Sequence, residues 1–331
     1  MRPSVVVVGS MNIDLVVKCR ERPRPGETVL GFEHRYVPGG KGANQAFAAG
    51  QLGGKVSLIG CIGNDPLGTI LSESLRGCGV DISPVTILPD IPTGAAFITL
   101  DEKGENSIIV SGGANAKLTP EMVSARSRVI VSSRVLLTQL ETPLPTVHRA
   151  LEIALSHGVK TVVNLTPVRP IPDDSIIWRS TVLALNELEA EYYTGIPVRS
   201  KEDAFRAGEA LLKKSVPPGT SSGAISGVPG NSGVEIALIT LGAEGSVAVS
   251  RASRKQVDAV PVEVVDTTAA GDTYIGAFGV EWLRSGDMEQ AMVFASHAAS
   301  LCVSRFGAQT SIPSEREVRD SMDARRRTGR N

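Results

Sequence analysis

The stretch Val265-Asp266-Thr267-Thr268-Ala269-Ala270-Gly271-Asp272-Thr273-Tyr274-Ile275-Gly276-Ala277 joins a run of alternating apolar residues to a long apolar helical pattern. It predicts a turn from a strand into a helix. Small residues at 269–271 leave bare backbone amides at the helix N-terminus, where the aligned peptide dipoles favour an anion. Asp272 would add a proton-accepting carboxylate beside that anion site. An aspartate that only stabilises the first helical turn is the alternative.

Strands rich in valine and isoleucine alternate with helical patterns on both sides of this stretch. The strands are expected at about 4–9, 56–59, 135–137, 160–164, 181–185 and 236–241. Strands buried on both faces and separated by helices predict an α/β fold with a doubly wound, mostly parallel sheet and helices on both faces. Ligands in such folds bind in crevices at the carboxyl ends of the strands.

Two segments, at about 13–37 and 93–115, contain strand patterns without intervening helices. We expect them to form a small separate sheet that acts as a lid over the crevice and excludes water. Residues 216–233 are nearly all proline, glycine, serine and threonine and predict a flexible surface insert. The whole chain, 1–331, is then expected to be a single domain with this lid and this insert.

The composition restricts the possible partners. Of 331 residues, 42% are hydrophobic and 21% are charged, and 34 basic against 35 acidic residues give a net charge of −1. This charge gives no support for a nucleic-acid or anionic-membrane partner. No apolar run approaches 18 residues, and the N-terminus begins directly with a strand, so we expect neither a membrane span nor a secretory signal.

The four cysteines, at positions 19, 61, 78 and 302, are scattered and form no metal-binding pattern with histidine. Free thiols in a reducing compartment are the expected state, so we expect a cytoplasmic protein.

Two polar motifs lie near the start of the chain. Asn12 and Asp14 fall on the same face of an alternating strand, where they could bind adjacent hydroxyls of a sugar or form an exposed polar edge. The sequence from Gly39 to Ala46 (GGKGANQA) is a glycine-rich turn that enters an alanine-rich helix. It is not a phosphate-binding P-loop, because Gly42 stands where that motif needs a hydroxyl residue. A flexible strand–helix connection is the alternative.

Two later motifs can be explained by local structure without a functional role. Asn186 and Glu189 have the spacing of a capping box. The strand at 236–241 leads into the glycine turn Gly242-Ala243-Glu244-Gly245. No dinucleotide-binding fingerprint occurs, because the segment from Gly77 to Ile82 lacks the third glycine, so a dehydrogenase is disfavoured.

Taken together, these motifs resemble the ribokinases of the PfkB sugar-kinase family over nearly the whole chain. The N-terminal signature matches 39–46, the C-terminal signature D-T-x-x-A-G-D matches 266–272, and the N-x-x-E element matches Asn186 and Glu189. The resemblance implies a ribokinase-like fold and ATP-dependent phosphorylation of the 5-hydroxyl of D-ribose. A related kinase for another sugar or a nucleoside, and a non-catalytic sugar sensor, remain alternatives.

The resemblance also assigns roles to individual residues. Asp272 matches the catalytic base, and Ala269, Ala270 and Gly271 match the anion hole. The sugar-binding positions correspond to Asn12, Asp14, Gly39, Gly40, Lys41, Asn44, Glu141 and Asp272. The ATP-binding positions correspond to Asn186, Glu189, Thr240, Leu241, Gly242, Ala243, Glu244, Gly245, Gly271, Asp272 and Ser296.

Cations and a partner are also implied. Glu189 would belong to the Mg²⁺ and phosphate network. An activating K⁺ would be held, largely through backbone carbonyls, by Asp266, Thr268, Cys302, Arg305, Gly307 and Ser311. The lid strands would pair two copies into a homodimer. Three features depart from the family pattern, namely Ser296 in place of a frequent histidine, Tyr274 in place of phenylalanine, and the insert at 216–233.

Overall fold

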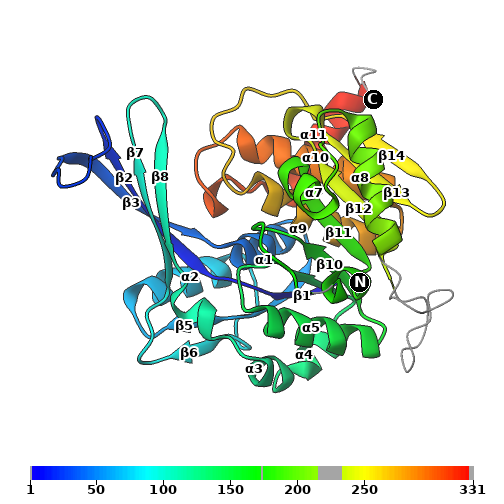
Figure 1. The fold of residues 1–331 in the computed structure, drawn as a ribbon, viewed down its shortest axis with the longest axis horizontal. Coiled ribbons are helices and arrows are strands. Elements are labelled where there is room, and N and C mark those ends of the chain that lie inside the picture. Colours follow the sequence, from blue (N-terminus) through cyan, green and yellow to red (C-terminus); the bar gives the residue numbers. More distant parts are fainter. Residues whose placement is uncertain (1, 173, 215–232, 328–331) are drawn as a thin grey trace.

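The computed structural model describes residues 2–172, 174–214 and 233–327. Apart from Gly233, the segment 216–233 that we predicted to be a flexible insert lies outside the described residues. The described part contains a central sheet, helices on both of its faces, and a separate small sheet that rises from one side (Figure 1).

The central sheet is organised around β1 (Ser4–Val8), whose sequence is SVVVV. Val5 and Val7 pack into one hydrophobic core, whereas Val6 and Val8 pack into the other, so the strand is buried on both faces. The eight strands have the order β14-β13-β12-β11-β10-β9-β1-β4. Their bounds besides β1 are β4 Lys55–Ile59, β9 Val135–Thr138, β10 Lys160–Asn164, β11 Val182–Asn186, β12 Ile236–Thr240, β13 Ser246–Ser250 and β14 Arg254–Val257.

The pairs from β4 through β12 are parallel, and β13 and β14 add an antiparallel edge. One core contains side chains of α1 (Lys41–Gln51), α2 (Pro66–Gly77), α9 (Ala270–Ser285), α10 (Met288–Val303) and α11 (Glu315–Arg327). The other core contains side chains of α3 (Pro120–Ser124), α4 (Ser127–Val131), α5 (Leu144–Ser156), α6 (Ser175–Trp178), α7 (Glu187–Thr194) and α8 (Lys201–Lys214). The predicted doubly wound, mostly parallel sheet with helices on both faces is confirmed.

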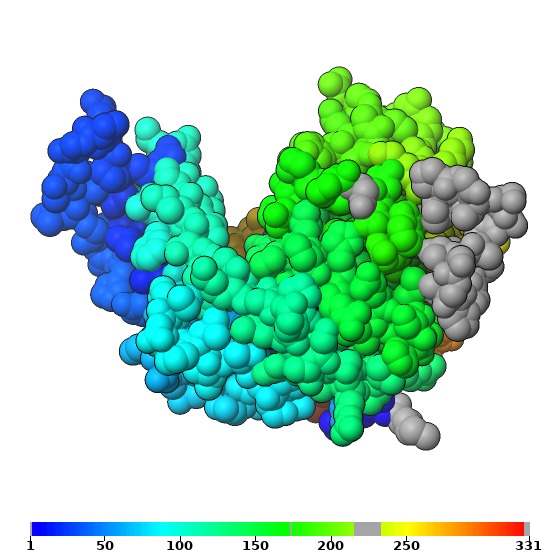
Figure 2. All heavy atoms as spheres, turned by 60° about the horizontal axis from the view of Figure 1, so that its bottom comes forward, coloured from blue at the N-terminus to red at the C-terminus, as the bar shows by residue number. Residues whose placement is uncertain are grey.

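The small sheet has the order β3-β2-β7-β8 and is formed by β2 (Asn12–Cys19), β3 (Gly31–Gly39), β7 (Gly94–Leu100) and β8 (Asn106–Ser111). These strands come from the two segments predicted to lack helices. A short parallel pair, β5 (Cys61–Gly63) and β6 (Thr86–Leu88), and the 3₁₀ turns η1 (Gly113–Lys117), η2 (Gly242–Glu244) and η3 (Gln309–Ser311) complete the structure. A hollow separates the small sheet from the main body in the space-filling view (Figure 2).

One local prediction is wrong. The alternating residues before α9 predicted a strand that leads directly into the helix, but β14 ends at Val257 and residues 258–269 are irregular. Pro261 has no N–H to donate to a sheet, and Val264 and Val265 are largely exposed. The backbone N–H of Val265 instead donates to the Val303 carbonyl at 2.8 Å, which joins this loop to the end of α10.

Local capping determines where some helices begin. The helix α2 starts after Asp65, which accepts from the Gly68 N–H at 2.8 Å, and Pro66 occupies its first turn. The short helix α3 starts after Thr119, whose side chain accepts from the Met122 N–H. Among the described residues, no helix combines the length and apolar character needed to cross a bilayer.

The order of the strands determines where a ligand crevice lies. The chain passes from β1 to its neighbour β4 on one side and later returns to β9 on the other side. The crevice between diverging connections at such a switch point is where open parallel sheets bind ligands. The residues that follow β1 and β9 therefore border the expected ligand crevice.

Candidate active site

The connections after β1 and β9 meet at the carboxyl ends of these strands. Ser10 follows β1, and its hydroxyl donates to the Glu141 carboxylate, which follows β9. The backbone N–H of Lys41 donates to the same Glu141 oxygen at 3.2 Å. Three segments that are far apart in sequence thus converge on one carboxylate.

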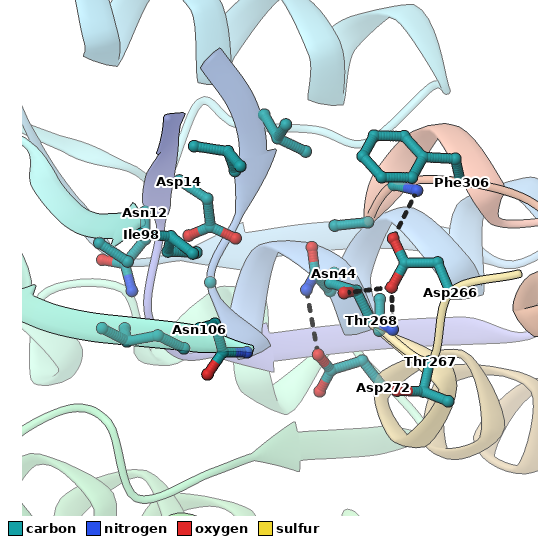
Figure 3. Close-up of a pocket in the computed structure, with 18 of the residues that line it drawn as sticks. Asn12, Asp14, Asn44, Ile98, Asn106, Asp266, Thr267, Thr268, Asp272 and Phe306 are labelled. Atoms are coloured by element: carbon teal, nitrogen blue, oxygen red, sulfur yellow. Dashed lines mark hydrogen bonds between the residues drawn. The ribbon is translucent and has the colours of Figure 1, made fainter. Parts of the chain in front are cut away.

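A cavity of about 720 Å³ opens above this point, between the small sheet and the main body (Figures 2 and 3). The predicted sugar-binding residues that line it are Asn12, Asp14, Gly40, Lys41, Asn44, Glu141 and Asp272. Gly39 does not line the cavity, but a β-carbon at this position would lie 2.9 Å from the Asp14 Oδ2 atom. The structure therefore gathers the predicted sugar positions around one hollow.

The Asn12 side chain has a fixed orientation. The buried Asn115 donates from Nδ2 to the Asn12 Oδ1 atom at 2.7 Å, and Asn115 is itself held by the main chain of Met11. Because the Asn12 oxygen is already engaged, the Asn12 amide N–H groups are left to face the cavity. Asn12 therefore offers donors and Asp14 offers acceptors on the same wall (Figure 3).

Three carboxylates surround a single lysine in this cavity. Burial, Glu141 and Asp272 raise the pKa of Asp14 from its ordinary value of 3.8 to about 6, while Lys41 lowers it. Burial lowers the pKa of the Lys41 ammonium, but Asp272, Glu141 and further carboxylates raise it, and the net pKa lies above the ordinary value. Lys41 therefore remains positively charged at neutral pH.

The glycine-rich turn before α1 allows the backbone to approach the β1–β2 connection closely. Gly40 has φ 84°, and a β-carbon there would lie 2.6 Å from the Asn12 backbone nitrogen. At Gly42 a β-carbon would lie 2.6 Å from the Gly9 carbonyl carbon. Side chains at either position would push α1 away from the sheet, so these glycines are required for packing as well as for the site.

The N-terminus of α9 faces a second, smaller cavity. Ala269 precedes the helix with φ 60°, a left-handed conformation that is unusual for alanine, and no side chain caps the helix. The adjoining cavity has a volume of about 240 Å³ and is lined by Ala269, Ala270, Gly271 and Asp272, among others. The Ala270 N–H donates weakly to the Thr267 carbonyl at 3.3 Å. The absence of a side-chain cap and the helix dipole make this cavity suited to an anion.

Asp272 lies between the two cavities and is 7% exposed. Its Oδ2 atom accepts from the Asn44 amide at 3.0 Å, and its Oδ1 atom accepts from the Gln45 amide at 3.1 Å (Figure 3 shows the Asn44 bond). Burial raises the pKa of Asp272, whereas Lys41, Asn44 and Gln45 lower it, and the net pKa lies above the ordinary value. Asp272 is thus a stronger base than a first-turn helix position alone would suggest.

The predicted nucleotide positions are only partly brought together. Asn186, Glu189 and Thr240 line the smaller cavity together with the start of α9. Asn186 and Glu189 form the predicted capping box, in which the two reciprocal bonds measure 2.8 and 2.9 Å. Residues 241–245 continue from β12 through η2 and line none of the described cavities.

Ser296 lies apart from the other predicted nucleotide positions. Its hydroxyl donates to the Asp258 carbonyl at 3.1 Å, and it lines a separate cavity of about 420 Å³. Tyr274, another departure from the family pattern, is fully accommodated, because its buried hydroxyl lies 2.8 Å from the Ser246 hydroxyl.

The predicted K⁺ positions lie on converging loops. Asp266 accepts from the backbone and hydroxyl of Thr268 and, at 3.0 Å, from the Gly307 N–H. The Cys302 thiol reaches the Thr268 carbonyl at 3.7 Å and the Ser311 hydroxyl at 3.1 Å. The Arg305 side chain pairs with Glu317 at 2.6 Å.

The resemblance implies a cation held largely through main-chain carbonyl oxygens in these loops. The described residues contain no cluster of three or more histidine, cysteine, aspartate or glutamate side chains that could hold a metal.

Sequence reasoning missed Phe306, which forms part of the wall of the larger cavity. The Lys18 ammonium lies 5.7 Å from the centre of its ring, and the Arg35 guanidinium lies 5.2 Å from it. Lys18 and Arg35 both belong to the small sheet and share the acidic partner Glu33. Phe306, in the segment after α10, thereby connects the main body to the small sheet through two cation–π contacts.

Ser10, Gln45 and Asn115 were also missed, although each contacts a predicted site residue. Gln45 lies within the N-terminal motif, and the sequence indicated no role for it. A buried polar residue inside an otherwise apolar helix face is the signal that could have identified it, because such a group needs a hydrogen-bond partner. Ser10 and Asn115 carried no comparable signal, since serine and asparagine are common in loops.

With this geometry in place, comparison with known proteins identifies the family. A family model described as pfkB family carbohydrate kinase matches residues 2–315. The chain belongs to the pfkB carbohydrate kinase family.

Two of the relatives that the chain resembles are a ribokinase and a deoxyribokinase. The chain is 35% identical over 323 residues to the ribokinase of Haemophilus influenzae, with 98% of this chain and 99% of the relative covered. It is 31% identical over 310 residues to the deoxyribokinase of Salmonella typhi, with 94% and 95% covered.

A solved structure of Arabidopsis thaliana ribokinase complexed with ribose and ATP superposes with a TM-score of 0.87. It is 32% identical to the chain in sequence, and the match covers 97% of this chain and 98% of the other. The overall fold of this pfkB kinase is therefore that of a ribokinase.

Proposed function

We propose that this protein transfers the γ-phosphoryl group of ATP to the 5-hydroxyl of D-ribose, giving D-ribose 5-phosphate and ADP. The observation that carries the proposal is the position of Asp272. It lines both the larger cavity with sugar-binding groups and the smaller cavity at the N-terminus of α9. A carboxylate at that junction would lie between a sugar bound in the larger cavity and a phosphate bound in the smaller one. The ribokinases among the relatives support ribose and ATP as the substrates.

The sugar end of the site has the polar groups that a polyol needs. Asn12 presents amide donors, and Asp14 and Glu141 present carboxylate acceptors, around one cavity. A vicinal diol both donates and accepts hydrogen bonds, so paired donors and acceptors bind it well. Holding the ring at these groups would place its 5-hydroxyl at Asp272 and convert the transfer into a reaction of pre-positioned groups.

The phosphate end has the groups that stabilise developing charge. The amides of residues 269–271 lie at the N-terminus of α9, and Lys41 lines both cavities. In the proposed step, the sugar oxygen bonds to the γ-phosphorus while the bond to the bridging β–γ oxygen breaks, and ADP leaves. The hydroxyl proton passes to the Asp272 carboxylate, and the amides and Lys41 stabilise the charge on the transferring group.

Two cations belong to the proposal. Glu189 and Asn186 line the phosphate cavity, and one oxygen of each also accepts a capping-box bond. Carboxylate oxygens are ligands that Mg²⁺ prefers, so Glu189 would hold Mg²⁺ there with ATP. When bound, Mg²⁺ neutralises charge on the phosphates. Carbonyls around Asp266 would hold K⁺ beside the anion hole, and the convergence of the loops at 265–268 and 302–311 supports that placement.

The small sheet is proposed to be a lid and the contact between two copies. One face, with Asp14, Val16, Ala96 and Ile98, lines the cavity. Because side chains alternate along a strand, the opposite face carries the exposed apolar residues Val17, Tyr36, Phe97 and Ile109. Exposed apolar sheet surface favours association, and a second copy of the same sheet would cover it. A cytoplasmic location fits the four free cysteines.

A coupled assay of ADP formation with D-ribose, 2-deoxyribose, fructose and adenosine tests the proposed reaction. We expect D-ribose to give the highest kcat/KM. Preferred use of 2-deoxyribose would favour the second candidate, a deoxyribokinase, to which one relative points. Binding of ribose by calorimetry without ADP formation would instead indicate a sugar sensor.

A further inference from the structure

Gln45 lies one residue beyond Asn44 in α1 and its side chain is completely buried. Its Nε2 atom donates to the Asp272 Oδ1 atom at 3.1 Å and to the Asn164 Oδ1 atom at 3.2 Å. Its Oε1 atom accepts from the Gln139 amide at 2.6 Å. The Gln45 side chain therefore uses both its donors and its acceptor within the protein core.

The network around Gln45 has a single consistent direction. The Asn164 Nδ2 atom donates to the main-chain carbonyl of Ala184 at 3.1 Å, so the Asn164 oxygen must face Gln45. Gln139 donates to the Gln45 oxygen, so the Gln45 amide nitrogen must face Asp272. A flipped Gln45 amide would set oxygen against the oxygens of Asp272 and Asn164. Gln139, Asn164 and Ala184, which come from the region of β9, β10 and β11, thereby orient the Gln45 N–H group that donates to Asp272.

We propose that Gln45 is a positioning residue that, with Gln139 and Asn164 behind it, orients the Asp272 carboxylate and keeps it ionised for proton transfer. Asn44 holds one carboxylate oxygen from the sugar cavity, and Gln45 holds the other from the core. With both oxygens bonded, the carboxylate cannot rotate when the sugar arrives. The role rests on the proposed function of Asp272 as the base.

The energetic consequence follows from the burial of Asp272. Removal from water disfavours the ionised carboxylate, and hydrogen-bond donors to the ionised form oppose this effect. Loss of the Gln45 donor should therefore raise the pH at which Asp272 gains its proton. Loss of fixed orientation should separately reduce the rate at pH values where Asp272 is still ionised.

The test is Gln45→Met, which keeps the length of the side chain and removes the donor. The matched control is Thr146→Val. Thr146 lies in α5, and its buried hydroxyl donates to the Leu118 carbonyl at 2.6 Å, so the variant removes a buried hydrogen bond outside the site. Both variants are compared with the wild type in thermal stability, in the pH dependence of kcat, and in the carbon-13 NMR titration of the Asp272 carboxyl. Loss of the resonance in Asp272→Asn assigns it.

We expect Gln45→Met to move the Asp272 titration and the acid limb of kcat upward by about half to one pH unit. We also expect kcat at high pH to fall by up to about 100-fold with KM for the sugar little changed. Thr146→Val should lower thermal stability alone. An unchanged Asp272 titration and unchanged kcat in Gln45→Met would overturn the proposal.

A second variant covers the case in which Gln45→Met does not fold. Gln139→Met removes the donor that orients Gln45 without touching Asp272, and it should produce a smaller shift in the same direction. An unshifted titration in a folded Gln139→Met protein would contradict the role of the network. Absence of kinase turnover in the wild type would contradict the proposed function, whereas the NMR titration without substrate would still decide the role of Gln45.

Discussion

The Asn44 side-chain amide donates to the Asp272 Oδ2 atom at 3.0 Å, although 228 positions separate the two residues in the chain. The bond joins the N-terminal turn of α1 to the N-terminal turn of α9. Each of these turns carries one of the two signature motifs, so the motifs form one site. A substitution in the N-terminal motif, such as one at Asn44, is therefore expected to affect Asp272 directly.

Gly271 allows the anion hole to be tested without disturbing the fold. A β-carbon at Gly271 would meet no atom within 4 Å, and its φ is not in the left-handed region. Gly271→Ala should keep or raise stability, by up to about 1 kcal/mol, because alanine reduces the freedom of the unfolded chain. The methyl group would occupy the phosphate cavity, so kcat should fall by about 100-fold or more.

Thermal denaturation and steady-state kinetics check this prediction, and Gly77→Ala is the matched control. Gly77 ends α2 and also has nothing within 4 Å of an added β-carbon, but it lines no described cavity. That control should remain fully active. Full activity in Gly271→Ala would contradict the anion hole.

The Asp14 carboxylate, which we expect to bind the sugar, should lower the stability of the folded protein at neutral and higher pH. Its folded pKa of about 6 exceeds its ordinary value of 3.8, so the native state binds more protons than the unfolded state between these pH values. Stability from this group is therefore greatest at low pH and decreases as the pH rises through 6. Asp14→Asn removes the buried charge and should be more stable than wild type at pH 8, by on the order of 2 kcal/mol.

Urea denaturation at pH 8 and at pH 4 measures this effect, and the gain should disappear near pH 4. Asp81→Asn is the control of opposite sign, because hydrogen bonds from Ser83 and Ser57 outweigh partial burial and lower the pKa of Asp81. That variant should gain no stability at pH 8. Equal stability of Asp14→Asn and wild type at pH 8 would refute the burial argument.

Phe306 should influence how firmly the small sheet closes over the sugar. Its ring contacts the Lys18 and Arg35 cations, and such contacts contribute about 0.5–1 kcal/mol at exposed sites. Phe306→Leu keeps apolar bulk but loses the attraction to the cations, so KM for the sugar should rise about 2- to 5-fold with kcat little changed. Phe306→Tyr keeps the ring and should retain the wild-type KM, and equal KM values in both variants would show that the contact has no role.

Much of the fold and the site could be predicted because both depend on local signals. Runs such as Ser4–Val8 indicate buried parallel strands, and glycine-rich turns indicate where backbone approaches a ligand. Part of the segment 258–269 was predicted to be a strand because its valines alternate. Pro261, which has no N–H, and the exposure of Val264 and Val265 explain why this segment does not pair with the sheet. Periodicity alone does not distinguish these cases.

The supporting residues that orient the site side chains could not be predicted from local sequence signals. Asn115 orients Asn12 and Gln45 orients Asp272 through contacts between segments more than 100 positions apart. Such contacts exist only after the sheet and helices have packed, and no spacing in the sequence encodes them. The cation–π contacts of Phe306 with the small sheet are of the same kind.

The central claim is that Asp272 acts as the base in ATP-dependent phosphorylation of D-ribose, and comparison of wild type with Asp272→Asn tests it most directly. ADP formation with D-ribose and ATP would be followed in a coupled assay, with ribose 5-phosphate identified by phosphorus NMR. The account predicts that the wild type forms ADP and ribose 5-phosphate in equal amounts. It also predicts that kcat falls by about 10²–10⁴-fold in Asp272→Asn with little change in KM. Near-normal turnover in Asp272→Asn, or no turnover of ribose by the wild type, would contradict it.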